Sequence, residues 1–152
     1  MAAQEHRQRY SAPVFEPWHR DLIAELRVAR LATIAPDGRP HLVPVCYALL
    51  EGRLAIAVDE KPKRSTELAR LRNIRRDPRV TLLFDRYDDD WSHLAWVRVD
   101  AHAQVHPTGS EWPEALEALR ARYSQYAGMA LESLPLIVAT PERVTGWSWT
   151  AG

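Results

Sequence analysis

Residues 92–106 alternate between two kinds of side chain. Successive side chains of a β-strand point to opposite faces, so this pattern predicts one long strand with two different faces. The face of small aliphatic residues suits the interior of a β-barrel. The face that mixes aromatic and charged residues suits an interface or the rim of a ligand site. The first face carries Val97, Val99, Ala101, Ala103 and Val105, and the second carries Trp96, Arg98, Asp100 and His102.

Shorter segments with the same two-residue period predict the other strands. We expect them at 30–35, 41–50, 53–59 and 79–85, with one or two final strands at about 136–139 and 143–149. Helices are predicted to begin near Pro17, at Ser65 or Thr66, and at Ser110, because prolines and small hydroxyl residues favour helix starts. This order of elements predicts a mainly β fold of the α+β class, a small closed antiparallel barrel of six strands.

The chain has 152 residues, which is the length of one domain. We expect residues 1–16 to form a flexible polar arm and residues 17–152 to form the domain. Twenty basic residues balance 20 acidic ones, which argues against a nucleic-acid binder, because that mode of binding neutralises many phosphates. No apolar run approaches the roughly 20 residues that span a bilayer.

The single cysteine, Cys46, cannot form an internal disulfide, which indicates a reducing compartment. The six histidines fall at no tight metal-ligand spacing. We therefore expect a cytoplasmic protein that holds no metal and has no nucleic-acid or membrane partner.

A basic segment joins the third predicted strand to the second predicted helix, and it contains Lys61, Lys63, Arg64 and Ser65. A helix N-terminus presents free N–H groups and a partial positive charge, so cations and hydroxyls placed there form a pocket for a phosphate or a carboxylate. The alternative is a solvated charged turn. Cations at a helix start oppose the helix dipole, however, and they destabilise the helix unless an anion offsets them.

Pro44 interrupts the predicted strand 41–50. Because proline has no backbone donor, it indicates an edge strand, or an opening where backbone groups face something other than a neighbouring strand. A flat heterocycle that hydrogen-bonds to the main chain would fit such an opening. The alternative is an ordinary edge strand.

Three tryptophans lie on predicted strand faces. Trp147 and Trp149 share one face of the last strand, and Trp96 belongs to the mixed face of 92–106. Such rings suit packing in a core or a dimer interface, or stacking beside a cofactor ring.

No known catalytic motif is present in the sequence. A Rossmann glycine motif, a P-loop and a serine-hydrolase elbow are all missing. Cys46 lacks the histidine and asparagine pattern that accompanies a cysteine nucleophile. We therefore name no catalytic residue. If the reaction uses a proton donor, the candidates are Tyr47, Tyr126 and His41.

Several short motifs together resemble the pyridoxamine-phosphate-oxidase-like split-barrel superfamily, over roughly residues 20–149. They are ARLATI at 29–34, DGRP and HLVPV at 37–45, KPKRS at 61–65, LRNI at 71–74 and DPRVTLL at 77–83. Three further segments resemble an actinobacterial branch that depends on coenzyme F420: residues 87–91, WVRV at 96–99 and GWSW at 146–149.

The resemblance implies a six-stranded antiparallel split β-barrel, also called an FMN-binding split barrel, which forms a homodimer with two cofactor sites at the subunit interface. It also implies an oxidoreductase that transfers a hydride between reduced coenzyme F420, a deazaflavin, and a small organic substrate. By position, the resemblance implies that Lys61, Lys63, Arg64 and Ser65 bind the cofactor phosphate. It implies that Val43, Pro44 and Val45 lie along the ring system, with Ala57 and Val58 beside it. It also implies that Trp96 and Trp147 lie at the rim of the site, where the other subunit can supply them.

Two alternatives keep the same fold. One replaces F420 by FMN, in which case the helix arginines Arg70, Arg72, Arg75 and Arg76 are a solvated face rather than a surface for the acidic F420 tail. The other is a flavin-, F420- or haem-binding protein without turnover, and a haem would need His41, His93 or His102 as its axial ligand. The chain ends with tryptophans at 147 and 149 where true pyridoxamine-phosphate oxidases carry a substrate-binding Arg/His segment. This departure argues against oxidation of pyridoxamine phosphate.

Overall fold

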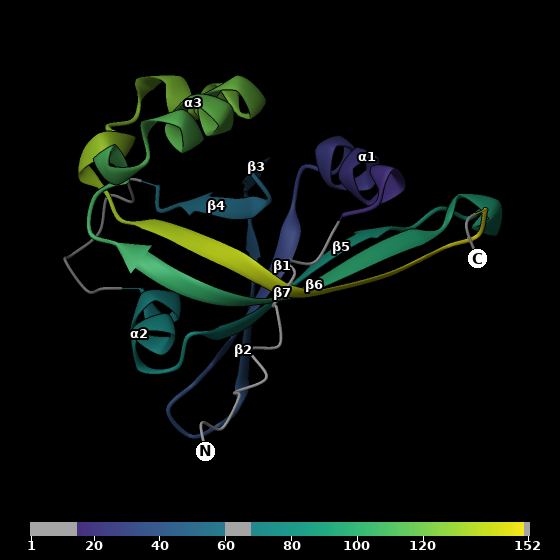
Figure 1. The fold of residues 1–152 in the computed structure, drawn as a ribbon, viewed down its shortest axis with the longest axis horizontal. Helices are drawn as coiled ribbons and strands as arrows, with labels where there is room; N and C mark the ends of the chain where they lie inside the picture. Colours follow the sequence, from purple (N-terminus) through teal and green to yellow (C-terminus); the bar gives the residue numbers. More distant parts are fainter. Residues whose placement is uncertain (1–14, 60–67, 151–152) are drawn as a thin grey trace, which may run out of the picture.

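The computed structural model describes residues 15–59 and 68–150. Within these ranges, seven strands form one antiparallel sheet in the order β2-β1-β5-β6-β7-β4-β3 (Figure 1). The predicted split β-barrel is confirmed, but with seven described strands instead of six. They are β1 (Ala29–Ile34), β2 (Pro40–Val45), β3 (Ala48–Leu50), β4 (Arg53–Ala57), β5 (Arg79–Arg86), β6 (Ala95–His106) and β7 (Leu136–Ser148).

The long strand predicted from residues 92–106 is β6. Its aliphatic face is buried, with Val97 and Val99 at 0% exposure, whereas Arg98 and His102 on the other face are exposed. The buried face joins an interior cluster that includes side chains from β1, β4 and β5. The strand starts later than predicted because residues 91–93 form a single 3₁₀ turn, η1.

In the described part of the chain, three α-helices pack on the sheet. Helices α1 (Pro17–Glu25) and α2 (Ala69–Arg76) contribute apolar residues to the interior cluster. Helix α3 (Pro113–Arg122) packs with β3, β4 and the first part of β7 around a second cluster (Figure 1). The remaining short turns are η1 (Trp91–His93), η2 (Gly109–Glu111), η3 (Ser124–Gly128) and η4 (Leu131–Ser133).

Two predicted helix starts are wrong. Helix α2 begins at Ala69 with Leu68 as its N-cap residue, and α3 begins at Pro113 with Trp112 as its N-cap residue. Leu68 packs against the interior cluster and its carbonyl accepts the first hydrogen bond of α2, so apolar packing sets this helix start. Ser110 lies in η2 instead.

The predicted strand 41–50 is two strands, β2 and β3, which lie at opposite edges of the sheet. Tyr47 lies between them and is fully buried. Its hydroxyl donates to the carbonyls of Ile23 at 2.5 Å and Leu26 at 2.7 Å, and its backbone N–H donates to the Tyr123 hydroxyl at 3.2 Å. These contacts with other elements replace strand pairing at this point, so the chain crosses from one edge of the sheet to the other.

The predicted final pair of strands is one continuous strand, β7. It pairs with β6 along its whole length, and the register shifts where Asp100 faces Arg143 while Ala101 faces Pro141. Glu142 is therefore the extra residue of a β-bulge. A bulge accommodates Pro141, which cannot donate to the ladder.

The predicted arm, residues 1–16, lies mostly outside the described residues. Of its last two residues, Phe15 is 4% exposed and packs in the interior cluster, and Glu16 is the N-cap residue of α1. The described part of this segment thus belongs to the start of the domain.

His19, near the start of α1, makes the stability of the fold depend on pH. Its Nδ1 accepts a hydrogen bond from the Glu16 backbone N–H at 3.0 Å, which requires the neutral imidazole. Burial lowers the pKa of His19, and the nearby Glu16 carboxylate raises it by less. The unfolded chain therefore binds a proton more readily than the folded chain, and stability falls as the pH drops below the unfolded pKa of about 6.5.

We expect His19→Gln to reduce this acid sensitivity, because glutamine keeps an acceptor but does not titrate. The measurement is the melting temperature at pH 7.5 and at pH 5. The drop between the two should be smaller in His19→Gln than in the parent chain. An equal drop in both would show that His19 does not contribute to the acid sensitivity.

Candidate functional site

The C-terminal end of β4 and the start of α2 border the basic segment. Ala57 and Val58 end this part of the barrel and are buried, with 6% and 7% exposure. They belong to different clusters, Val58 to the interior and Ala57 to the cluster under α3. Lys61, Lys63, Arg64 and Ser65 lie outside the described residues, so their role stays a prediction.

A group of polar side chains lies beside this junction. Arg70, in the first turn of α2, is half-buried, and its Nε is buried without a hydrogen-bond partner among the described residues. Burial lowers the pKa of Arg70, while Asp59 and Tyr126 raise it by less. Asp59 follows Val58, two residues after the end of β4. The Arg70 side chain therefore lies near Asp59 and Tyr126 and retains an unused donor at Nε.

Tyr126 and Cys46 form one side of this group. Tyr126, in η3, is 7% exposed. Burial raises its pKa most, followed by the Cys46 thiol and the Asp59 carboxylate, and a hydrogen bond joins its side chain to Cys46. The raised pKa of Tyr126 keeps its hydroxyl neutral near pH 7, so this group does not compensate the charge of Arg70. Sequence reasoning missed this group because Tyr126 is far along the chain from Arg70 and no local pattern links them.

The segment Val43–Val45 lies in β2, which is an edge strand of the sheet. The edge position predicted from Pro44 is therefore confirmed. Pro44 is exposed and pairs in register with Arg30 of β1, whereas Val45 is 6% exposed and shares the interior cluster with Val58. Because Cys46 comes next and contacts Tyr126, the structure brings the end of β2 towards the end of β4.

Trp96 and Trp147 lie elsewhere in the chain. They face each other across β6 and β7, and Trp147 is 38% exposed. His106, at the other end of β6, pairs with Leu136, which in turn pairs with Ala57. At about 3.3 Å per residue, the length of β6 puts the two tryptophans roughly 33 Å from the end of β4. Within one chain, the two tryptophans therefore lie far from the end of β4.

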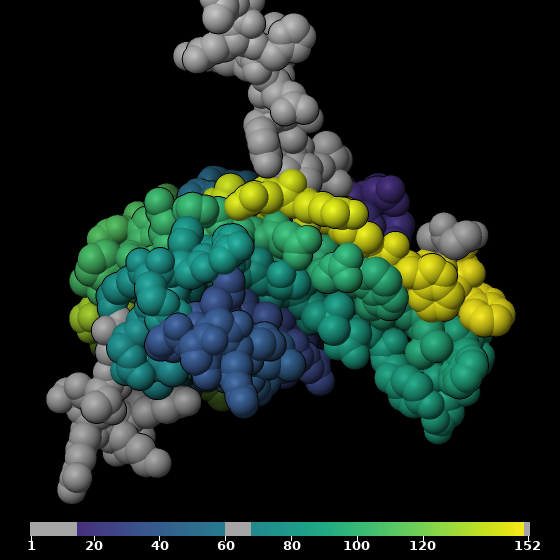
Figure 2. Space-filling model, turned by 90° about the horizontal axis from the view of Figure 1, so that it is seen from below, coloured from purple at the N-terminus to yellow at the C-terminus, as the bar shows by residue number. Residues whose placement is uncertain are grey.

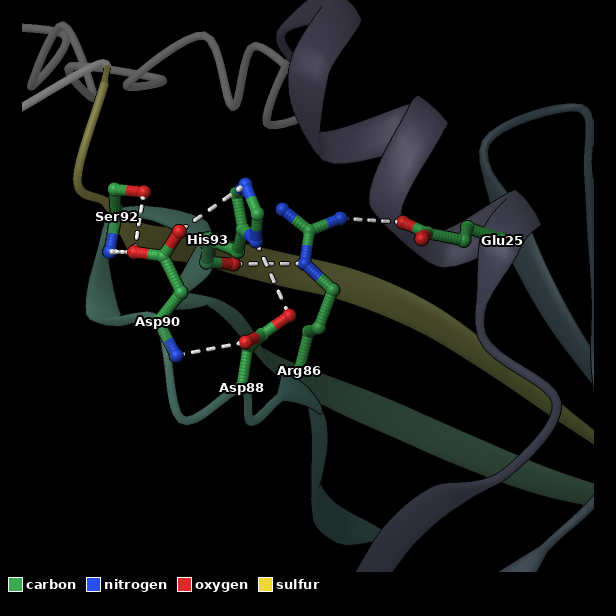
Figure 3. Close-up of polar contacts among 6 residues, drawn as sticks. All are labelled: Glu25, Arg86, Asp88, Asp90, Ser92 and His93. Carbon is green, nitrogen blue, oxygen red and sulfur yellow. Dashed lines mark hydrogen bonds and ion pairs between the residues drawn. The ribbon is translucent and has the colours of Figure 1, made fainter.

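The β5–β6 turn near these tryptophans is held by a polar network (Figure 3). Arg86 bonds the Glu25 carboxylate at 2.5 Å and the His93 carbonyl at 2.8 Å. The His93 ring contacts Asp88 at 3.1 Å, and Asp90 accepts from the Ser92 hydroxyl at 2.7 Å. These bonds fix an exposed tip that also carries Tyr87 and Trp91, at 70% and 61% exposure.

The described residues include no cluster of three or more histidine, cysteine, aspartate or glutamate side chains arranged to hold a metal ion. In the same ranges, no helix is long and apolar enough to cross a membrane.

Comparisons with known proteins agree with this architecture. Among solved structures, the conserved hypothetical protein Rv2991 from Mycobacterium tuberculosis is 25% identical with a TM-score of 0.69, covering 91% of this chain and 88% of its own. HutZ, the heme storage protein from Vibrio cholerae, is 18% identical with a TM-score of 0.69, covering 88% and 93%. An F420 reductase is 20% identical with a TM-score of 0.65, covering 87% and 98%.

The family model described as pyridoxamine 5'-phosphate oxidase matches residues 15–148. This match includes all seven described strands and the three α-helices. The chain therefore belongs to the pyridoxamine 5'-phosphate oxidase family of split β-barrels.

Proposed function

We propose that this protein is an oxidoreductase that binds coenzyme F420 and transfers a hydride between the reduced cofactor and a small organic substrate. Family membership supports a flavin-like cofactor and redox chemistry. Structural likeness to an F420 reductase favours the deazaflavin. The observation that carries the proposal is the half-buried guanidinium of Arg70, whose Nε has no partner among the described residues, at the junction that the basic segment borders.

The residues at this junction fit an anionic cofactor. Lys61, Lys63, Arg64 and Ser65 would hold its phosphate, and the β4 residues Ala57 and Val58 would support that end. The edge strand β2, with Val43, Pro44 and Val45, would lie along the ring system. A ring packed there would be held by backbone groups and apolar side chains.

We also propose that the protein acts as a homodimer. Leu42 on β2 and Trp147 on β7 are large apolar side chains with 64% and 38% exposure. Figure 2 shows that the surface is hollowed between the β1–β2 hairpin and the tip of the β5–β6 turn. A second copy seated on this surface would cover these side chains and would bring its own Trp96 and Trp147 to the rim of the cofactor site.

When bound, the deazaflavin supplies the hydride chemistry. The chain's own residues bind and orient the cofactor and exclude water from its reactive face. No side-chain acid or base needs to act in the hydride step itself. Tyr126 is one of the three candidate proton donors, and its raised pKa keeps its hydroxyl protonated near neutral pH.

The test is to titrate the apo protein with F420 and with FMN, following fluorescence, and then to repeat the titration with the Lys61→Ala/Lys63→Ala/Arg64→Ala variant. A charge-assisted hydrogen bond is worth about 1.5–3 kcal/mol. We therefore expect the triple variant to bind F420 at least about 100-fold more weakly. Arg39→Ala is the control, because its side chain is 85% exposed and lies in the β1–β2 turn.

Binding by the triple variant that equals that of the parent would reject the cofactor site. Micromolar binding of FMN with none of F420 would reverse the order of the two cofactors. Binding of F420 without oxidation of its reduced form across a panel of quinones, enones and biliverdin would indicate a binding protein instead of an enzyme.

A further inference from the structure

A cavity of about 430 Å³ lies between α1, α3 and the turn that joins β3 to β4, and we call it the α1–α3 cavity. Helices α1 and α3 both pack on β3 and lie on either side of it (Figure 1). The turn precedes β4, whereas the junction with α2 follows the other end of that strand. β3 and β2 are also opposite edges of the sheet. The α1–α3 cavity is therefore a different region from the proposed cofactor site.

Most of the described lining of this cavity is apolar. Both helices present alanines to it, so the side chains around the space are short and leave it open. Cavities of roughly 300–1,000 Å³ that are mostly apolar, with a few well-placed polar groups, are typical of sites for small molecules. The apolar lining residues are Ile23, Ala24, Ala48, Leu49, Ala118 and Ala121.

An open strand edge borders the cavity at Leu49. Glu51 and Gly52 have φ values of 53° and 72°, which is the geometry of a two-residue β-hairpin turn. The pair that flanks such a turn, here Leu50 and Arg53, is hydrogen-bonded, so the N–H and C=O of Leu49 point away from β4. No described strand pairs with β3 on that side. A backbone donor and a backbone acceptor are therefore available at the cavity.

The charged side chains around the cavity leave an excess of positive charge. Arg122 on α3 donates to three backbone carbonyls. The Arg20 guanidinium on α1 lies 5.8 Å from the centroid of the Phe15 ring and makes no ion pair or hydrogen bond among the described residues. Glu51, the acidic residue of the described lining, is paired with Arg53 at 3.5 Å. The charge of Arg20 therefore remains available to an anion.

From these features we propose that the α1–α3 cavity binds a small apolar carboxylate, such as an aromatic acid. The apolar body of the ligand packs on the alanines of the two helices. Its carboxylate accepts charge-assisted hydrogen bonds from Arg20, which are stronger than those between neutral groups. The open N–H of Leu49 offers the ligand a further donor. This inference goes beyond the proposed function and requires no bound cofactor.

The test titrates the protein with naphthalene-2-carboxylate and with its neutral carboxamide, following backbone amide resonances by NMR. The resonances of Leu49 and Gly52 should shift, because both residues line the cavity. We expect a dissociation constant on the order of 0.1–1 mM for the carboxylate. The carboxamide should bind about 10-fold more weakly, since it lacks the charge that Arg20 recognises. No binding, or shifts confined to other parts of the chain, would reject the cavity as a site.

Two variants separate the charge from the apolar surface. Arg20→Gln should weaken binding of the carboxylate about 10-fold and change that of the carboxamide less than about twofold. Ala121→Phe should weaken both ligands at least about 10-fold, because its ring occupies the cavity. The matched controls are Arg39→Gln, in the exposed β1–β2 turn, and Ala127→Phe, exposed in η3, and neither should change binding.

Three results would overturn the proposal. An unchanged preference for the carboxylate in Arg20→Gln would show that this arginine does not recognise the anion. Displacement of the carboxylate by FMN would place it in the cofactor site instead. A change of oligomeric state in Ala121→Phe, measured by sedimentation, would assign the cavity to contacts between copies of the chain. A parent chain that binds neither F420 nor FMN would contradict the proposed function and would leave this site untouched.

Discussion

Replacing Arg122 with alanine is expected to lower the free energy of unfolding by about 3–5 kcal/mol, because one guanidinium serves several backbone carbonyls of other segments. Its Nε donates to the Tyr47 carbonyl at 2.9 Å, and its Nη2 donates to the Leu26 carbonyl at 2.7 Å. Its Nη1 donates to the Ala24 carbonyl at 3.1 Å. The guanidinium also lies over the Tyr47 ring, 4.9 Å from its centroid. Removing it takes this donor from all three carbonyls, of which only that of Leu26 also accepts from the Tyr47 hydroxyl among the bonds described above.

Urea unfolding measures this effect, with Arg39→Ala as the surface control. Arg122→Lys should lose most of the same stability, since a single ammonium cannot bridge three carbonyls on different segments. A loss below about 1 kcal/mol in Arg122→Ala would mean that water replaces the guanidinium at all three carbonyls.

Gly109→Ala is expected to destabilise the fold by about 3 kcal/mol. Its backbone N–H donates to the Leu134 carbonyl at 2.8 Å, which holds η2 against the segment before β7. A Cβ at this position would overlap the Leu131 carbonyl oxygen and approach Leu116 Cδ2 to 3.0 Å. Relief requires a shift of the backbone, because the closest atom is not at the end of a side chain.

The matched control is Gly128→Ala, where an added Cβ meets nothing within 4 Å. Thermal unfolding of both variants should show a large decrease for position 109 and a change of at most about 0.5 kcal/mol at position 128. Equal stabilities of the two variants would show that the segment of Leu131 yields easily to an added methyl group.

The strands with a clear local period were predictable from sequence. The alternation around Val97 and Val99 depends only on which neighbours point inward, so β6 was identified correctly. The break at Tyr47 was not predictable, because the partners of this residue are Ile23, Leu26 and Tyr123, which come from other parts of the chain. The two-residue period of residues 41–50, taken alone, predicts a single strand.

The candidate site was predictable only in part. Pro44 indicated an edge strand because a missing donor is a local property, and β2 is an edge strand. The relation of Arg70 to Tyr126 depends on how η3 packs under α3, and no spacing in the sequence encodes it. The roles of Lys61, Lys63, Arg64 and Ser65 stay predictions, and so does the contribution of Trp96 and Trp147 from a second copy.

The place of β7 in the sheet has a consequence for synthesis of the protein. β7 is the last described strand in the chain, and it joins β6 on one side to β4 on the other. A nascent chain that lacks residues 136–148 therefore carries two open strand edges, which are prone to pair with other chains. We expect the barrel to close only after these residues leave the ribosome, and chains truncated before residue 136 to aggregate.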